Sequence, residues 1–519
     1  MRKRNVWTAL AAAAMVMQLV GTAGPSAAQT TPDVSFTFTP TSGPAGTKIK
    51  FTGTGCPHDA TQAFDGLVFL TTQGSNTPIN STQFTSDAEG KFAPELDTTG
   101  IAPGQYVTYA VCTKTSKGGP GSLFTVTVPV IPGSTYFPLT PARVLDTRTG
   151  LGVGGAINKI GAGGQIDVKV TDLLGVPAAN VTAVALNVVA TDVVGPASYL
   201  TVFPAGQARP EASNLNYVPG VSVPNLVIAR VGIDGKVSMY NNLGTVNVAA
   251  DIQGYFQGDS TGSSYIPLAP ARVLDTRVGT GGTSAPVGPG GTIELKVTDA
   301  GGVPAAGGTA VALNVTATNV SGLESYLTVW PSGSSRPVAS NLNFIQGQTV
   351  PNLVIARVGV DGKISIYNNL GTVDVVADTQ GYFAAPVSAP PLPGSVYYPA
   401  NPVRILDTRT GVGVPGGAQG QLGQGGTLDL QVTGQGGVPA NATSVVLNVT
   451  AADSPGPDSY LTVYPTGNAR PLASNLNFVA GQTIPNLVIA KIGSGGKVTI
   501  YNNLGSTVVV ADVQGWFTA

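Results

Sequence analysis

The sequence predicts an all-β protein in which one N-terminal β-sandwich is followed by three tandem β-sandwich repeats of jelly-roll type. The first observation is that one ordered set of segments occurs three times, starting near Tyr136, Tyr265 and Tyr398. The second is that these segments are short and alternate apolar with polar residues, as half-buried strands do. The third is the composition, because 69 Gly and 40 Pro accompany 42% apolar residues, which is typical of a turn-rich β-protein.

The first 28 residues have the pattern of a secretory signal peptide. Arg2, Lys3 and Arg4 precede an apolar run over 6–20, and small residues follow at 26–28. A retained membrane anchor is less favoured, because the run is shorter than the roughly 20 residues that span a bilayer. We therefore expect a secreted, extracellular protein, released or associated non-covalently with the cell wall, without a membrane span after cleavage.

The charge balance gives no reason to expect a nucleic-acid partner. Cleavage of the signal peptide would remove three of the 26 Lys+Arg residues and leave 23 against 27 Asp+Glu. Such a surface lacks the basic patch that binds phosphate backbones or anionic lipids.

Residues 33–129 form the first predicted domain, in which alternating segments such as FTFTP, LVFLTT and GQYVTYAVC are separated by Gly, Pro and Ser turns. Cys56 and Cys112 are the two cysteines of the chain, and in an oxidising compartment we expect them to form a disulfide. The segment SGPAGT, followed by strands that end at the two cysteines, resembles bacterial Ig-like (IPT/TIG) modules. That resemblance implies an Ig-like sandwich used as a spacer or docking module.

The three repeats are predicted over 135–257, 264–384 and 397–519, each with about eight strands. Asp146, Asp275 and Asp407 occupy equivalent places 129 and 132 residues apart, a domain-sized period. In the first repeat, Val184, Leu186 and Val188 should point into the sandwich, and the apolar run 224–232 should be covered on both faces. Asp234-Gly235 and Asp361-Gly362 predict tight hairpins.

Linkers are expected at 130–134, 257–264 and 384–396. The last contains AAPVSAPPLPGSV, whose prolines favour an extended, semi-rigid spacer. The linkers therefore predict that the domains are strung out along the chain like beads.

The repeats carry a recurring order of motifs, LDTR, SYLTV, SNLN, PNLVIA, YNNLG and QGYF or QGWF. This order resembles a tandem module of secreted proteins from high-GC Gram-positive bacteria, over some 380 of the 519 residues. The resemblance implies modules that are attached to cell-wall hydrolases and other exported enzymes or stand alone, with no established activity. No segment of this sequence has the pattern of an attached enzyme, so we do not expect a hydrolase function by this resemblance.

Charged residues recur mainly in the LDTR motif. We favour a partly buried structural ion-pair cluster over the alternative of a ligand-gripping site. Its members are Arg143, Asp146 and Arg148, then Arg272, Asp275 and Arg277, then Arg404, Asp407 and Arg409.

Aromatic and amide side chains form the candidate ligand-binding set. The alternation in SYLTVF should turn Tyr199, Thr201 and Phe203 outward, and Asn214 and Asn216 share one face of SNLN. Outward aromatics with amides suit sugar binding, although a contact between domains would look the same. The set comprises Tyr199, Phe203, Asn214, Asn216, Tyr326, Trp330, Asn341, Asn343, Tyr460, Tyr464, Asn475 and Asn477.

No catalytic, cofactor or metal site is expected. Asp251, Asp378 and Asp512 recur, but we favour a structural role over a glycosidase pair with the LDTR aspartate. His58 is the one histidine, favoured as a surface turn residue, so no triad or zinc set can be assembled in a repeat. The sequence shows no phosphate loop and no calcium loop.

The leading hypothesis is a secreted, non-enzymatic surface protein with multivalent binding to cell-wall or environmental glycans. The second is a structural protein whose repeats bind each other or other surface proteins. The third, less favoured, is a glycoside or cell-wall hydrolase that uses the recurring carboxylates.

Overall fold

The computed structural model describes residues 34–44, 47–72, 77–98, 101, 104–113, 118–127, 133–386 and 394–519. Within these residues the regular structure consists of β-strands and four 3-10 turns. The predicted signal peptide lies outside these residues, as do parts of two predicted linkers, 130–132 and 387–393. The chain divides into two compact units, Met1–Val130 and Ile131–Ala519, and each is described by itself.

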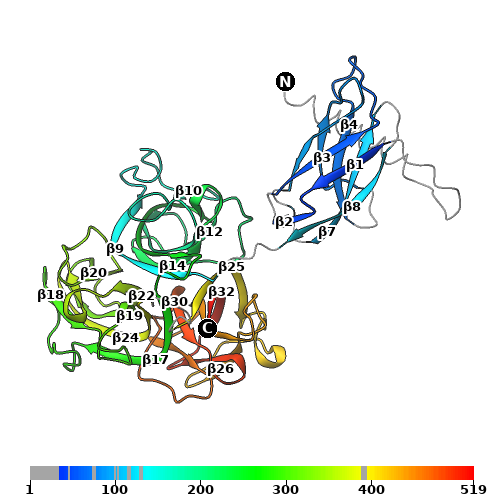
Figure 1. The fold of residues 1–519 in the computed structure, drawn as a ribbon. Coiled ribbons are helices and arrows are strands. Elements are labelled where there is room, and N and C mark those ends of the chain that lie inside the picture. The colour runs from blue at the N-terminus through cyan, green and yellow to red at the C-terminus, as the bar shows by residue number, and fades with distance from the viewer. Residues whose placement is uncertain are drawn as a thin grey trace. The chain divides into compact units, whose positions relative to one another are not determined.

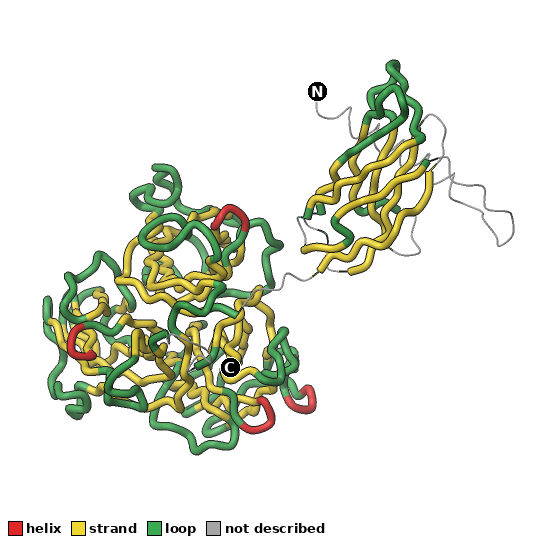
Figure 2. The backbone as a smooth tube through the Cα atoms, in the orientation of Figure 1, coloured by secondary structure: helices red, strands yellow, loops and turns green. Residues whose placement is uncertain are grey.

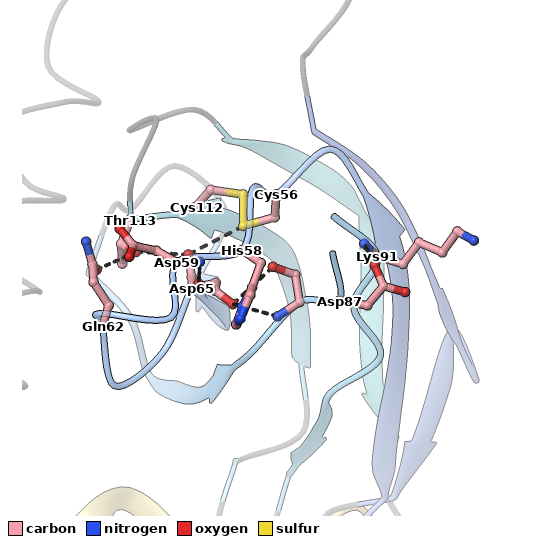
Figure 3. Close-up of a disulfide and its surroundings, with 10 residues drawn as sticks. Cys56, His58, Asp59, Gln62, Asp65, Asp87, Lys91, Cys112 and Thr113 are labelled. Atoms are coloured by element: carbon pink, nitrogen blue, oxygen red, sulfur yellow. Dashed lines mark hydrogen bonds and ion pairs between the residues drawn. A yellow bond between two sulfur atoms is a disulfide. The ribbon is translucent and has the colours of Figure 1, made fainter. Parts of the chain in front are cut away.

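The first unit is a sandwich of two sheets, with strand orders β1-β3-β6 and β2-β8-β7-β4-β5. Ile49, Phe51 and Phe124 are fully buried between them, and the predicted disulfide joins Cys56 to Cys112 (Figure 3). The strands are β1 (Ser35–Thr39), β2 (Ser42–Pro44), β3 (Lys48–Thr54), β4 (Gly66–Thr72), β5 (Asn80–Phe84), β6 (Glu95–Asp97), β7 (Gly104–Cys112) and β8 (Gly118–Thr127).

Each repeat of the second unit has eight strands in two four-stranded antiparallel sheets, so the predicted all-β sandwich class is confirmed. In repeat 1 the sheet β14-β11-β16-β9 faces the centre of the unit, and the sheet β10-β15-β12-β13 lies on the side of the repeat away from that centre (Figure 1). The strands of repeat 1 are β9 (Thr135–Asp146), β10 (Gln165–Lys169), β11 (Val181–Val194), β12 (Ser198–Pro204), β13 (Leu215–Tyr217), β14 (Val223–Arg230), β15 (Lys236–Asn241) and β16 (Thr245–Gln257), with the 3-10 turn η1 (Ile233–Gly235).

Repeats 2 and 3 have the same strand orders, β17-β24-β19-β22 with β18-β23-β20-β21 and β25-β32-β27-β30 with β26-β31-β28-β29. Repeat 2 contains β17 (Ser264–Asp275), β18 (Thr292–Lys296), β19 (Gly308–Ser321), β20 (Ser325–Pro331), β21 (Leu342–Phe344), β22 (Val350–Arg357), η2 (Val360–Gly362), β23 (Lys363–Asn368) and β24 (Thr372–Ala384). Repeat 3 contains β25 (Val396–Asp407), η3 (Pro415–Gly417), β26 (Thr427–Gln431), β27 (Ala442–Ala452), β28 (Ser459–Pro465), β29 (Leu476–Phe478), β30 (Ile484–Lys491), η4 (Ser494–Gly496), β31 (Lys497–Asn502) and β32 (Val508–Thr518).

Strand faces follow the predicted alternation inside each sandwich. Val184, Leu186 and Val188 of β11 enter the core of repeat 1, as predicted. The hairpin before β15 has the expected backbone, because Asp234 and Gly235 have φ values of 55° and 68°.

For the three repeats the prediction of domains strung out like beads is wrong, because they pack around one centre (Figures 1 and 2). A separate apolar cluster joins them, and Leu226 and Ile228 of β14 belong to it while Val227 of the same strand belongs to the core of repeat 1. The run 224–232 is therefore covered on both faces, as expected, but its second cover is the neighbouring repeats.

Six aromatic rings fill the centre of the three-repeat body. Each repeat supplies one Tyr and one Phe, and each Tyr packs against a Phe of another repeat. The inter-repeat ring pairs are Tyr136–Phe383, Tyr265–Phe517 and Tyr397–Phe256, with centroids 4.3, 4.5 and 4.4 Å apart. The Gly of QGYF is explained by this packing, since a Cβ on Gly254 would lie 2.2 Å from the Tyr136 hydroxyl oxygen.

The segments expected to be spacers instead tie the repeats together. Ser263, in the predicted second linker, exchanges two backbone hydrogen bonds of 2.8 Å with Tyr136. Ser395 does the same with Tyr265, and Ser134 with Tyr397, so three equivalent bridges close a ring.

Candidate functional site

Buried asparagines link each repeat to its neighbour. Asn352 of repeat 2 donates from Nδ2 to Asn187 of repeat 1 at 2.7 Å, and its Oδ1 accepts the Leu226 amide at 3.0 Å. Asn187 in turn donates to the carbonyl of Ser340 in repeat 2. The asparagines at these two recurring positions are therefore explained by the packing of one repeat against the next.

The same amide network is found at the other two boundaries. Between repeats 2 and 3 it consists of Asn486 with Asn314, Leu353 and Ser474, and between repeats 3 and 1 of Asn225 with Asn448, Leu487 and Ser213.

The LDTR residues form a network of ion pairs within each repeat. Arg143 donates from Nε and Nη2 to the two oxygens of Asp251 at 2.7 and 3.0 Å, and from Nη1 to Asp146 at 3.1 Å. Arg148 binds the two oxygens of Asp146 through Nε and Nη2 at 2.9 and 2.8 Å. The equivalent sets are Arg272, Asp275, Arg277 with Asp378, and Arg404, Asp407, Arg409 with Asp512.

The two carboxyls of this network have opposite pKa shifts. The hydrogen bond from Arg148 holds the pKa of Asp146 below its ordinary value. Burial raises the pKa of Asp251, although Arg143 opposes the shift. The backbone amide of Ser340 also donates to Asp251, so this carboxylate joins repeat 1 to repeat 2.

Part of the predicted aromatic platform is not exposed. Phe203, expected to face outward, is only 2% exposed, and Trp330 and Tyr464 at the equivalent places are also buried. The cause is the segment after β12, which folds back over the outer sheet and is held by the hydrogen bond from Thr201 Oγ1 to the Ala212 carbonyl. In repeat 2 the corresponding segment is also held by the hydrogen bond that the Trp330 indole N–H donates to the Ser334 carbonyl.

The first asparagine of each SNLN motif is buried as well, so it does not lie exposed beside the aromatics as the predicted ligand-binding set requires. Asn214 Oδ1 accepts the Val202 amide at 2.7 Å and so fixes the returning segment to β12. Asn341 and Asn475 bind the Val329 and Val463 amides in the same way.

Tyr199, Tyr326 and Tyr460 are half-buried, as are Asn216, Asn343 and Asn477. In repeat 2 the Tyr326 ring lies 6.3 Å from the Tyr367 ring, and the Arg336 guanidinium stacks on Tyr367 at 3.8 Å from its centroid. The arginine and second tyrosine were not predicted as site residues. Their recurrence in all three repeats could have identified them from the sequence, as the pairs Arg209–Tyr240, Arg336–Tyr367 and Arg470–Tyr501.

A pocket of about 550 Å³ lies between repeats 1 and 2 and brings several candidates together. Arg143 and Arg148 of repeat 1 line it with Tyr326 and Asn343 of repeat 2. The charged cluster, the amide and the aromatic thus meet across a boundary and not within one repeat. Residues that sequence reasoning missed also line it, namely Asp192, Ser222, Glu324 and Asn369. We call this site the inter-repeat pocket.

A smaller pocket of about 180 Å³ occupies the equivalent place between repeats 2 and 3. Tyr460, Asn477 and Asn503 line it, and they correspond to Tyr326, Asn343 and Asn369. The repeat 3 side of the site is thus reproduced at this boundary, but Arg272 and Arg277, the equivalents of Arg143 and Arg148, do not line the smaller pocket.

The first unit has its own polar cluster beside the disulfide (Figure 3). His58 is exposed in the loop before β4, and its Nδ1 lies 3.0 Å from the buried Asp65. This hydrogen bond and those from the Ser86 and Asp59 amides lower the pKa of Asp65. The cluster fixes the loop that the disulfide also anchors.

Within the described part of the chain, no helix is long and apolar enough to cross a membrane, and no group of three His, Cys, Asp or Glu residues is placed to hold a metal ion.

No family model matches the chain, and no curated protein matches it. Solved structures that resemble it include one described as the triple jelly roll fold and turret assembly in an archaeal virus, with 11% identity over 75% of this chain and 90% of that one and a TM-score of 0.15. Another is described as the atomic structure of Sulfolobus Turreted Icosahedral Virus, with 10% identity, coverages of 74% and 91%, and a TM-score of 0.15. The sandwich fold is assigned from the sheet order alone.

Proposed function

We propose that this chain is a secreted, non-enzymatic binding protein that attaches to cell-wall or environmental glycans at the boundaries between its repeats. The observation that carries the proposal is the inter-repeat pocket. Its volume of about 550 Å³ falls within the roughly 300–1,000 Å³ of small-molecule clefts. A tyrosine ring, two amides and two guanidinium groups line it, and such groups can stack on a sugar ring and bind hydroxyls.

The carboxylates of the LDTR network support binding without catalysis. Glycoside hydrolysis needs one carboxylic acid that can protonate the leaving oxygen and a second carboxylate that acts as base or nucleophile. Arg148 binds both oxygens of Asp146, and Arg143 binds both oxygens of Asp251. Both carboxylates thus have their two oxygens engaged by arginines, and neither is among the residues that line the inter-repeat pocket.

The test is sedimentation of the mature chain, residues 29–519, with purified cell wall and a set of insoluble polysaccharides. We expect binding to at least one of them. Replacing Tyr326 with Ala should weaken this binding about five-fold or more, as truncation of an aromatic anchor does. The triple change of Tyr199, Tyr326 and Tyr460 to Ala should remove it, because linked sites compensate for one another.

Val278→Ser provides the control, since Val278 is exposed and lies outside the pocket lining. Failure of the wild-type protein to sediment with any of the polysaccharides would refute glycan binding. Equal binding by the folded triple variant would exclude the pocket.

A second candidate function is self-association through the outer surface. Val338 and Leu472 occupy the same place in repeats 2 and 3 and are 86% and 84% exposed, beside the stacked Arg336 and Arg470. Light scattering at rising concentration tests it: self-association predicts a growing mass without sugar, and Val338→Ser with Leu472→Ser should prevent the growth.

A further inference from the structure

The charges around the inter-repeat pocket indicate which saccharides it can take. Its two guanidinium groups are already neutralised, because Arg148 is paired with Asp146 and Arg143 with both Asp146 and Asp251. A paired guanidinium still has N–H groups for hydroxyls, but it offers little net attraction to a carboxylate or sulfate.

Two further carboxylates lie at the pocket. Asp192 accepts a hydrogen bond of 3.0 Å from Asn247, and its charge acts on Arg148. Glu324 is exposed on the repeat 2 side. Lys159 is a further cation here, because its Nζ donates to the carbonyl of Asp192. The formal balance around the pocket is therefore four carboxylates, namely Asp146, Asp192, Asp251 and Glu324, against Arg143, Arg148 and Lys159.

Arg148 retains a donor for a neutral ligand. Its side chain is 43% exposed and lines the pocket. Its contacts to protein, within the residues that the structure describes, are made through N, Nε and Nη2, which leaves Nη1 to face a ligand hydroxyl. The Tyr326 ring supplies an apolar face on the opposite repeat.

The acidic side chains are not the same at each boundary. Glu324 corresponds to Asp458 in repeat 3 but to Ala197 in repeat 1, and Asp192 corresponds to Asn319 in repeat 2. The pocket between repeats 1 and 2 is thus both the larger of the two and the one with both extra carboxylates.

We propose that the pocket between repeats 1 and 2 binds saccharides without anionic groups and prefers a protonated amino sugar to its neutral counterparts. This inference rests on the proposed function and adds the ligand class. Asp192 and Glu324 supply the attraction for the ammonium group, while Tyr326 and the free guanidinium edge of Arg148 hold the ring and its hydroxyls.

Four soluble oligosaccharides test the proposal by calorimetry with the mature chain. Cello-, chito- and chitosan oligosaccharides share one linkage and differ at C2, where they carry hydroxyl, acetamido and ammonium groups, and an oligogalacturonate supplies carboxylates. We expect the chitosan oligomer to bind most tightly and the oligogalacturonate not to bind. Asp192→Asn and Glu324→Gln should each lower the chitosan advantage about two- to five-fold, as expected for exposed charge pairs. Asp299→Asn, at an exposed site away from the pocket, is the control.

Three outcomes are separable. If none of the four oligomers binds in a Tyr326-dependent way and no polysaccharide sediments the protein, the proposed function itself is wrong. If neutral oligomers bind through Tyr326 but the chitosan oligomer has no advantage, or the oligogalacturonate binds as well, only the ligand class is wrong. The proposed ligand class would also be wrong if the double variant Asp192→Asn with Glu324→Gln still bound the chitosan oligomer more tightly than the neutral oligomers to the same degree.

Discussion

Asn352 and Asn187 are 165 residues apart in the chain and share a buried hydrogen bond of 2.7 Å between two repeats. Asn352 also donates to the carbonyl of Asn341 and accepts the amide of Leu226. One amide side chain therefore satisfies three groups that would otherwise be buried without partners. This relationship makes the three sandwiches one body, because equivalent amides do the same at the other boundaries.

Asn352→Ala should destabilise the three-repeat body by about 2–4 kcal/mol. The change leaves the Leu226 amide and two oxygens without a partner, and each such group costs about 1–3 kcal/mol when buried. Chemical denaturation measures the loss. Asn242→Ala, at a recurring but partly exposed asparagine, should cost less than about 1 kcal/mol. Equal effects of the two changes would contradict a special role for the buried amides.

Phe383→Ala should cost about 3–5 kcal/mol, the usual loss for a fully buried ring. Phe383 packs against Tyr136 of repeat 1 and Phe517 of repeat 3 as well as Tyr265 of its own repeat. Thermal unfolding is the measurement. Tyr367→Ala removes a half-buried ring on the outer sheet and should cost clearly less. A cost below about 1 kcal/mol for Phe383→Ala would mean that the repeats are stable without their shared centre.

The fold class and the inward faces of strands could be predicted from sequence because they depend on local alternation. Val184, Leu186 and Val188 enter the core of their own sandwich as period-two patterning requires. The arrangement of the repeats could not be predicted in this way. Ala183 and Ala185, on the opposite face, are small enough to look like tolerated surface residues, yet they are fully buried in the shared cluster. Alternation identifies two faces of a strand but does not say what covers the second.

The candidate site was predicted in part for the same reason. Tyr326 and Asn343 do line a pocket, but with Arg143 and Arg148 of the preceding repeat, and no pattern within one repeat contains that contact. Phe203 was predicted to be exposed but is buried, because the segment after β12 folds back over it. The periodicity of a strand does not indicate the path of the loop that follows it.

Removal of the disulfide should affect only the first unit. Cys56 and Cys112 are 56 residues apart, and closing a loop of that size stabilises a domain by about 4 kcal/mol in the chain-entropy model. The double change Cys56→Ser with Cys112→Ser should therefore lower the melting temperature of one calorimetric transition. The transition of the three-repeat body, which has no cysteine, should stay where it is. A shift of both transitions by a similar amount would show that the two units unfold together.

Asp146→Asn should destabilise the three-repeat body at neutral pH but not in strong acid. The hydrogen bond from Arg148 holds the pKa of Asp146 below its ordinary value in the folded protein. The ionised carboxylate therefore contributes stability above about pH 4, and this contribution is lost as the pH falls through the lower folded pKa. Breaking a buried pair costs about 3–5 kcal/mol, and the 43% exposure of Arg148 reduces this to about 1–3 kcal/mol.

Urea denaturation of the wild type and Asp146→Asn at a series of pH values from neutral downward measures this difference. It should shrink once Asp146 of the wild type becomes protonated. Asp167→Asn is the control, because Asp167 binds Ser238 on the outer sheet and has no arginine partner among the described residues. The difference in unfolding free energy between Asp167→Asn and the wild type should vary less over this pH range. A protonated carboxyl keeps the shape of the side chain but loses most of its attraction for a guanidinium. If the difference in unfolding free energy between the wild type and Asp146→Asn stayed constant down to the lowest pH, the Arg148 pair would therefore stabilise the fold by its geometry and not by its charge.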